Sequence, residues 1–197
     1  MKTVISQDYY TAPHMITECI KIFKDEMKDF QNISEHLINV LDFDDSPDLT
    51  EIHPKDRTNI SIYVIVLYGH SHIIADEVQR KFSKTREYVQ TMPGVTVLKC
   101  IAIGPNSIVP LHLDDMSREP YDLNKWYSVF TGVTVPSENA DLIGIEIDKD
   151  TYSHAEEKSI VFDTQIPHCA WNNTDQWWIS LRFNTNKENF QNVNIFR

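Results

Sequence analysis

The chain has 197 residues, of which 41% are hydrophobic and 24% charged, values typical of a globular protein large enough to bury a core. Twenty-nine acidic residues against eighteen basic ones give a net charge of −11, so nucleic acid and anionic membranes are not expected as partners. The three cysteines lie far apart and predict neither a disulfide framework nor a cysteine metal site. With no apolar run of membrane-spanning length and no secretory signal, we expect a cytoplasmic protein.

The first 92 residues carry mainly helical patterns. Thr11 and Pro13 resemble a helix start, with Thr11 as the N-cap. Apolar residues then recur every three or four positions as far as Phe30, which predicts an amphipathic helix. The next predicted elements are a second helix, an acidic loop, a strand and a third helix, at residues 32–41, 42–57, 60–68 and 74–92.

From residue 93 the pattern changes to short strands separated by turns. The predicted strands are 95–103, 108–114, 126–135, 142–147, 159–162, 167–171 and 177–184, with a polar loop at 117–125 and a turn region at 149–157. Helices first and strands second predict an α+β class in which helices back one sheet of a sandwich or barrel. We expect a single domain over 1–197, with a helical support region at 1–92, a β-barrel core at 93–185 and a C-terminal tail at 186–197.

A His-x-Asp pair, His112 and Asp114, lies in one of these predicted strands. Because side chains alternate along a strand, both would lie on the same face. His168, about fifty residues later, could join them in the folded sheet. Two imidazoles and one carboxylate form the ligand set of non-haem Fe(II) oxygenases. A His-x-Asp pair also arises by chance, so the alternative is a solvated pair at a strand end.

The last predicted strand separates into an apolar and a mixed face. The apolar face has Trp177, Ile179, Leu181 and Phe183, and the mixed face has Trp178, Ser180, Arg182 and Asn184. An arginine in the middle of a strand is costly to bury without an anionic partner. If the mixed face points into a barrel, Arg182 can bind a carboxylate through its guanidinium fork, with Ser180 beside it. In the alternative, this face meets water and Arg182 pairs with an acidic side chain.

Several motifs of the second half resemble one enzyme family. They are residues 93–95, 103–112, 134–136 and 159–175, and the most specific stretch reads VFD, then His168-Cys-Ala-Trp-Asn-Asn-Thr-Asp175. Over residues 93–185 the chain resembles the aspartyl/asparaginyl β-hydroxylase family of Fe(II)/2-oxoglutarate oxygenases. The resemblance implies a double-stranded β-helix, a jelly-roll or cupin-like barrel with the metal at one mouth. His112 and His168 occupy the positions of the two iron-binding histidines of that family.

The chain departs from the pattern of this family at three places. Asp114 stands where many relatives have glycine, which restores the His-x-Asp triad of the wider oxygenase superfamily. The 2-oxoglutarate-binding arginine of the family falls ten residues after the second histidine, where this chain has Trp178. Arg182, on the same strand face, could take over the salt bridge. The arginine that follows the first histidine in the family is not evident, and Arg118 or Lys125 of the polar loop could replace it.

The resemblance implies an Fe(II)- and 2-oxoglutarate-dependent dioxygenase that uses O₂ to hydroxylate a small amino-acid-like or peptidyl substrate. Metal and catalytic positions would be His112, Asp114 and His168, and cosubstrate positions Arg182, Ser180 and Trp178. Two alternatives stay open: an iron-dependent oxidase that does not use 2-oxoglutarate, and a cupin-like binding module without turnover. The sequence does not indicate the oligomeric state.

Overall fold

The computed structural model describes residues 4–5, 10–28, 62–69, 74, 76–113, 126–163 and 165–190. The predicted helix 32–41, the loops 42–57 and 117–125, and Asp114 lie outside these ranges. The elements are β1 (Val4–Ile5), α1 (Pro13–Met27), β2 (Ile62–Gly69), α3 (Asp76–Lys81), α4 (Ser83–Val89), β3 (Val95–Ile103), β4 (Ser107–His112), β5 (Trp126–Thr134), β6 (Ile143–Ile147), β7 (Asp150–Ser153), β8 (Ser159–Phe162), β9 (His168–Asn172), β10 (Trp178–Asn186) and the 3₁₀ helix η5 (Lys187–Asn189).

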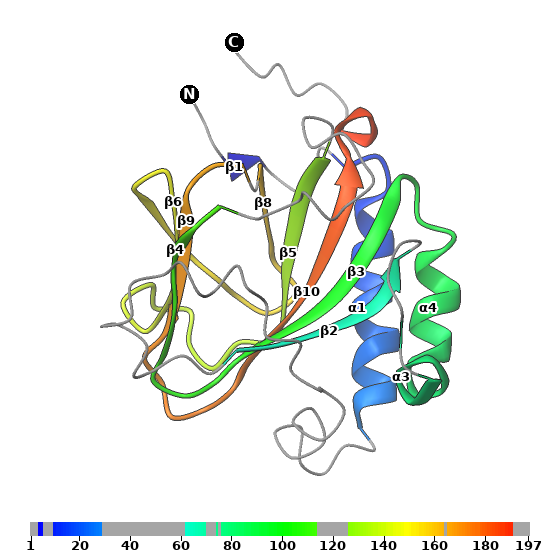
Figure 1. Ribbon diagram of the computed structural model, residues 1–197, viewed down its shortest axis with the longest axis horizontal. Helices are drawn as coiled ribbons and strands as arrows, with labels where there is room; N and C mark the ends of the chain where they lie inside the picture. The colour runs from blue at the N-terminus through cyan, green and yellow to red at the C-terminus, as the bar shows by residue number, and fades with distance from the viewer. Residues whose placement is uncertain are drawn as a thin grey trace.

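The described strands form two antiparallel sheets, shown in Figure 1. The larger sheet has the order β1-β8-β5-β10-β3-β2, and the smaller has β4-β9-β6-β7. From β3 to β10 the chain passes back and forth between the two sheets, which is the strand order of a double-stranded β-helix, or jelly roll. The helices α1, α3 and α4 lie together on the side of the larger sheet away from the smaller one. The predicted α+β class, with helices backing one sheet, is confirmed.

Two apolar cores occupy the two faces of the larger sheet. One lies between this sheet and the helices and includes Phe23, Phe82, Leu181 and Phe183. The other lies between the two sheets and includes Phe130, Ile145, Ile160 and Trp178. Strand β10 contributes alternate residues to both cores, because successive side chains of a strand point to opposite faces. Its mixed face, with Ser180 and Arg182, therefore points between the sheets, into the barrel.

Helix α1 begins one residue later than the sequence suggests. Ala12 is the N-cap and makes no side-chain capping bond, while Pro13 occupies the first helical turn. The prediction of Thr11 as the N-cap was wrong, because the backbone of Thr11 turns to the C-terminal segment and its N–H donates to the Asn189 carbonyl at 2.8 Å. The helix then buries Ile16, Cys19, Ile20, Phe23 and Met27.

The single helix predicted at 74–92 is two helices in the described structure. The break falls at Phe82, whose φ of −108° and ψ of 33° are not helical. Phe82 stacks on Phe23 of α1, with ring centroids 5.3 Å apart. Glu26 of α1 then caps α4 from outside: its carboxylate accepts the backbone N–H groups of Lys84 and Thr85 at 2.9 and 3.0 Å and the Thr85 hydroxyl at 2.6 Å. This distant cap explains why local sequence did not reveal the break.

Strand β7 was missed within the predicted turn region 149–157. Strands β6 and β7 form a hairpin whose two-residue turn is Asp148-Lys149, with φ values of 50° and 72°. Both residues are left-handed, as a type I′ turn requires, although Asn-Gly or Asp-Gly is the usual signal for such a turn. The hairpin was not predicted because Lys149 stands where glycine is the usual signal.

The Asn-Asn-Thr segment after β9 has a structural function. The buried Asn172 amide donates to the carbonyls of Ile103 and Gly104 at 3.0 Å and of Gln176 at 2.8 Å. Its carbonyl oxygen accepts the backbone N–H and the hydroxyl of Thr174 at 3.1 and 2.7 Å. Asn172 thus joins the β9–β10 turn to the end of β3, at the end of the barrel away from His168.

None of the helices in the described ranges has the length and apolar character needed to cross a membrane.

Candidate active site

Strands β4 and β9 bring His112 and His168 together. The two residues are direct partners across the antiparallel pair, and their ring centroids lie 4.3 Å apart with the planes inclined at 49°. The pairing of β4 with β9 is irregular between Val109 and His112. His168 has the same parity as Ala170, which lies in the core between the sheets, so its ring faces the barrel interior.

The two imidazoles have matching hydrogen bonds. The His112 Nδ1 lies 2.7 Å from the Pro110 carbonyl oxygen, and the His168 Nδ1 lies 2.9 Å from the Ile166 carbonyl oxygen. A carbonyl oxygen accepts only from a protonated nitrogen, so each Nδ1 carries a proton and Nε2 is the ring nitrogen left to bind a metal. Metal-ligating histidines in proteins are oriented in this way, with the second nitrogen bound to a carbonyl or carboxylate. The pair therefore fits a metal ion held by two Nε2 atoms.

The pair lies at a partly covered mouth of the barrel. His168 is buried and His112 is half-buried. The ring of Phe162, at the end of β8, meets the His168 ring edge-on with centroids 5.0 Å apart. No group of three or more His, Cys, Asp or Glu side chains suited to a metal occurs within the described ranges. The predicted third ligand, Asp114, lies outside those ranges, two positions beyond His112 in the sequence.

The inward face of β10 carries the residues predicted to hold the cosubstrate. Trp178, Ser180 and Asn184 are buried, and Arg182 is half-buried. The Ser180 hydroxyl has no hydrogen-bond partner among the described residues. Arg182 lies directly between Phe130 of β5 and Lys99 of β3. The alternative of a solvent-facing polar strand is wrong for β10, because these side chains are covered by the second sheet.

Trp178 has the surroundings of a core residue. It is fully buried, and its ring meets those of Phe130 and His154 edge-on at 5.7 and 5.4 Å. His154 is also fully buried and stacks on Phe130 at 5.1 Å, and burial lowers the pKa of its imidazole to about 4. Trp178 lies three inward positions along β10 from Asn184. It therefore fills the closed part of the barrel, and these contacts do not favour its predicted place in a cosubstrate site.

The side chain of Trp171 lies outside the barrel. Trp171 alternates with His168 and Ala170 on β9, so its side chain is on the outer face of the smaller sheet. Its indole N–H donates to the Ala140 carbonyl at 2.9 Å. A Cβ built on Gly144 would collide with its ring at 2.3 Å, so the glycine is required by this packing.

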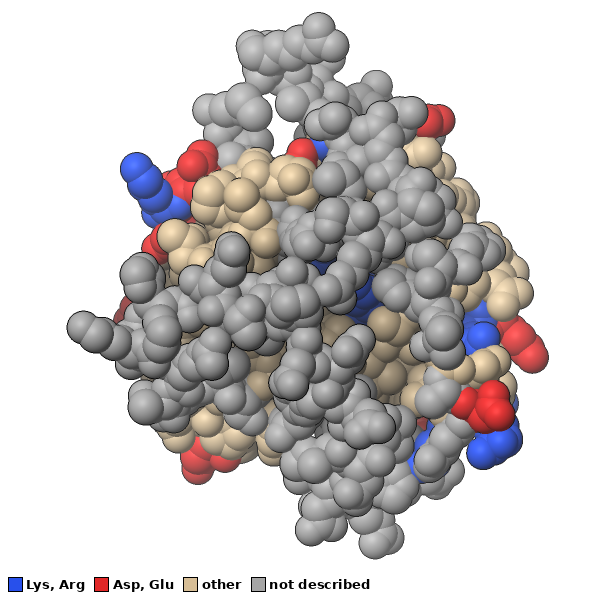
Figure 2. All heavy atoms as spheres, in the orientation of Figure 1, with Lys and Arg blue, Asp and Glu red and all other residues tan. Residues whose placement is uncertain are grey.

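Sequence reasoning missed Lys99. This residue interrupts the otherwise apolar run of β3, where Leu98 and Cys100 contribute to the helix-side core. Lys99 therefore points into the barrel, half-buried, and is the direct partner of Arg182. A charged residue inside a buried strand was the available signal. Figure 2 shows Lys or Arg atoms near the middle of the face, over β10 and its neighbours, apart from the charged side chains at the rim.

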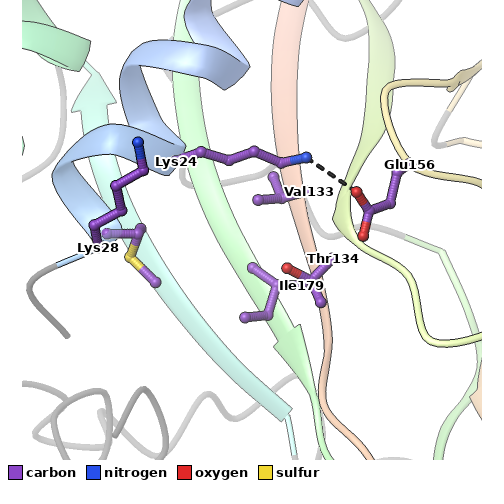
Figure 3. Close-up of a pocket in the computed structure, with 7 residues that line it drawn as sticks. Lys24, Lys28, Val133, Thr134, Glu156 and Ile179 are labelled. Atoms are coloured by element: carbon purple, nitrogen blue, oxygen red, sulfur yellow. Dashed lines mark hydrogen bonds and ion pairs between the residues drawn. The ribbon is translucent and has the colours of Figure 1, made fainter. Parts of the chain in front are cut away.

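A pocket of about 190 Å³ lies on the other face of the larger sheet. Ile179, on the helix side of β10, lines it together with Lys24 and Lys28 of α1, Val133 and Thr134 of β5, and others. Figure 3 shows Lys24 reaching across to Glu156, with a distance of 3.0 Å between nitrogen and oxygen. The sheet separates this pocket from the histidine pair, so the two are not parts of one site.

Comparisons with known proteins identify a hydroxylase family. The sequence profile of the family described as aspartyl/asparaginyl beta-hydroxylase matches residues 27–187. The "ornithine lipid ester-linked acyl 2-hydroxylase" of Rhizobium tropici is 33% identical over 93 residues, which are 47% of this chain and 30% of that protein. The chain therefore matches less than a third of the length of this relative.

Solved structures with a similar fold include oxygenase and cupin domains. A prolyl-4-hydroxylase from Pseudomonas putida has 14% identity and a TM-score of 0.40, with 66% of this chain and 74% of that chain covered. The Cnp3 cupin domain of Schizosaccharomyces pombe has 6% identity and a TM-score of 0.39, with 67% and 71% covered. Because neither TM-score reaches 0.5, the fold assignment here rests on strand order and the family match.

Proposed function

Because this chain belongs to the aspartyl/asparaginyl β-hydroxylase family, we propose that it is an Fe(II)- and 2-oxoglutarate-dependent hydroxylase. One observation carries the proposal: His112 and His168 are cross-strand partners, and each binds a backbone carbonyl through Nδ1. Their Nε2 atoms would hold the iron, and Asp114 is the proposed third ligand. Two imidazoles and one carboxylate leave coordination positions open for reactants.

The proposed reaction inserts one oxygen atom into a C–H bond of the substrate. Bound iron would supply the activation of O₂, and 2-oxoglutarate supplies two electrons as it becomes succinate and CO₂. One atom of O₂ enters the succinate carboxylate and the other the product hydroxyl, so atoms and electrons balance. The protein positions the reactants and excludes water. The Pro110 and Ile166 carbonyls contribute by fixing the tautomer and orientation of the two imidazoles.

We place the far carboxylate of 2-oxoglutarate on the inward face of β10. Arg182 offers a planar fork of N–H donors that binds a carboxylate bidentately. Ser180, two residues along the same face, offers a buried hydroxyl that has no partner among the described residues. Trp178 is left out of the proposed set because it packs in the core between the sheets.

The substrate we propose is a small amino-acid-like or peptidyl molecule, as the family name suggests. One observation favours a second candidate, an acyl chain. Leu111 and Leu113, on either side of His112 in the sequence, are 61% and 54% exposed, so large apolar side chains are exposed next to this proposed ligand. The partial relative from Rhizobium tropici is named for an acyl substrate. Hydroxylation of fatty-acyl amides but not of free amino acids or peptides would select this candidate.

Reconstitution without oxygen tests the function. Protein loaded anaerobically with Fe(II) should bind one iron and, with 2-oxoglutarate, develop the visible charge-transfer band of the chelate. Admitting O₂ should convert 2-oxoglutarate to succinate. His112→Ala and His168→Ala should each lose the band and the turnover, whereas His14→Ala, an exposed histidine of α1, should change neither. Asp114→Ala tests the third ligand. Iron binding that is unchanged in both site variants would refute the proposed site.

The same assay separates the alternatives. Consumption of O₂ without 2-oxoglutarate would indicate the alternative of an iron-dependent oxidase that does not use 2-oxoglutarate. Tight metal binding with no O₂ consumption over a broad substrate set would indicate a binding module. A cytoplasmic location is part of the proposal and rests on composition alone.

A further inference from the structure

Asp163 binds the backbone of the connection that leads from β8 to β9. It follows β8 directly, and β9 begins five positions later at His168. The Asp163 carboxylate accepts the backbone N–H of Gln165 through Oδ1 at 3.1 Å, and the Asp163 carbonyl accepts the N–H of Ile166 at 3.0 Å. Two successive N–H groups are thus bound to one residue, through the side-chain-to-backbone contact of an Asx turn.

The carbonyl that orients His168 lies at the end of this connection. It belongs to Ile166, and its oxygen is 2.9 Å from the His168 Nδ1. Because Ile166 precedes Pro167, its backbone is restricted to extended conformations. On the far side, the Pro167 carbonyl accepts the N–H of Asp148, in the β6–β7 turn, at 3.1 Å. The direction of the Ile166 carbonyl is therefore set from both sides, and Asp163 provides the contacts on the β8 side.

Lys187 holds the Asp163 carboxylate from the other end of the chain. Its ammonium lies 2.6 Å from Oδ2, while Oδ1 accepts from Gln165, so the two oxygens have separate partners. The side chains of Lys187 and Asp163 are only 22% and 26% exposed, which distinguishes this ion pair from a fully solvated one. Because Lys187 belongs to η5, the pair joins the β8–β9 connection to the segment that follows β10.

The contacts of Asp163 differ from those of a metal ligand. The described residues include no group of three His, Cys, Asp or Glu side chains suited to a metal, so Asp163 does not complete the histidine pair. The Lys187 ammonium also lies 4.8 Å from the centre of the Tyr127 ring, which belongs to the core on the helix side of the larger sheet. The ion pair is thus on the helix side, whereas the two histidines face the barrel. Asp163 can act on the metal site only through the backbone that leads to His168.

We propose that Asp163 is a positioning residue for the metal ligand His168, and that Lys187 holds its carboxylate in place. This inference rests on the proposed function and extends it to two residues outside the metal site. Asp163 fixes the connection, the connection fixes the Ile166 carbonyl, and the carbonyl keeps the proton of the His168 ring on Nδ1. Nε2 is thereby directed to the metal, as in other metal sites where the second ring nitrogen is bound to the protein.

Metal affinity, measured apart from turnover, tests the inference. The metal-free, full-length chain is titrated with Co(II) without oxygen and followed by visible absorption. Asp163→Ala should weaken Co(II) binding about tenfold to a hundredfold, the range typical of a lost outer-sphere partner. Asp163→Asn, which keeps an oxygen for the Gln165 N–H, and Lys187→Met, which keeps the carboxylate, should each weaken it only several-fold. Asn139→Ala is the matched control, because it removes the same kind of bond, from the Asp141 N–H at 3.0 Å, and should leave the affinity unchanged.

Nitrogen NMR of the metal-free protein provides a readout that a general loss of stability would not change. In the wild type both His112 and His168 should carry a proton on Nδ1. In Asp163→Ala the proton of neutral His168 should be shared between its two nitrogens. His112 is oriented by the Pro110 carbonyl within β4, so its proton should stay on Nδ1.

The outcomes separate the inference from the proposed function. Wild-type Co(II) affinity and an unchanged His168 ring in Asp163→Ala would overturn the inference and leave the function standing. An equal loss of affinity in Asn139→Ala would also overturn it, because the effect would then be general destabilisation. If His168→Ala binds Co(II) as tightly as the wild type, the proposed function fails and the inference fails with it. Thermal unfolding shows which variants are folded; if Asp163→Ala is not, unchanged affinity in both Asp163→Asn and Lys187→Met would overturn the inference.

Discussion

Protonation of His154 should account for part of the stability that this protein loses in mild acid. His154 lies fully buried at the end of the barrel that Trp178 fills, with its Nε2–H donating to the Lys158 carbonyl at 3.0 Å and its ring stacked on Phe130. Burial lowers the pKa of the imidazole from 6.5 to about 4. We expect the substitution His154→Gln to remove a calculable part of the pH dependence of the free energy of unfolding.

The sign and size follow from proton linkage. Between pH 6.5 and 4 the unfolded chain binds a proton at His154 and the folded chain does not, so the free energy of unfolding falls as the pH falls through this window. Two states whose pKa values are 6.5 and about 4 give a loss of about 2 kcal/mol between pH 7 and 5. For a chain of this size, that corresponds to a decrease of about 4–8 °C in Tm.

Urea unfolding at pH 7 and pH 5 measures this loss. The wild type should lose about 2 kcal/mol more than His154→Gln between these two conditions, because the titration of the other groups cancels in the difference. His14→Gln, at an exposed histidine, is the matched control and should lose as much as the wild type. Equal losses in the wild type and His154→Gln would show that His154 is not held neutral in the folded barrel.

Two further substitutions test contacts that join distant segments. Asn172→Ala leaves three backbone carbonyls without their donor and should lower the free energy of unfolding by about 2–4 kcal/mol, whereas Asn173→Ala, at the exposed neighbour, should cost less than 1 kcal/mol in urea unfolding. Glu26→Ala removes the external cap of α4 and should cost about 1–2 kcal/mol, with exposed Asp25→Ala as the control; equal costs for these two variants would contradict the capping role.

Local patterns were sufficient where one strand or helix face decides the burial. The alternation in β10 predicted which residues point to the helices and which to the barrel, and the two cores confirm this division. The motif around the second histidine predicted its approach to the first, and the structure places the two rings 4.3 Å apart. In both cases the information lay within a few residues of sequence.

Contacts between distant segments decided the rest. Glu26 of α1, 58 residues before Lys84, caps the start of α4 inside the predicted third helix. Lys99 and Arg182 become neighbours only through the register of β3 and β10. The Asn-Asn-Thr stretch was interpreted as part of an enzyme motif, but Asn172 joins the β9–β10 turn to the end of β3. Spacing along the chain does not predict these contacts, because they depend on which helices, strands and turns become neighbours in the fold.

The register of β10 also explains why its arginine is at position 182. In the family pattern it lies ten residues after the second histidine, which here is Trp178. Strand β10 runs back toward the mouth, so later residues lie nearer to His168: the row of Asn184 includes Phe162, which contacts that histidine. An arginine at position 178 would be fully buried against Phe130 and far from the mouth, at a large desolvation cost. At position 182 the arginine lies one inward step from the row of Asn184 and Phe162, and it is only half-buried.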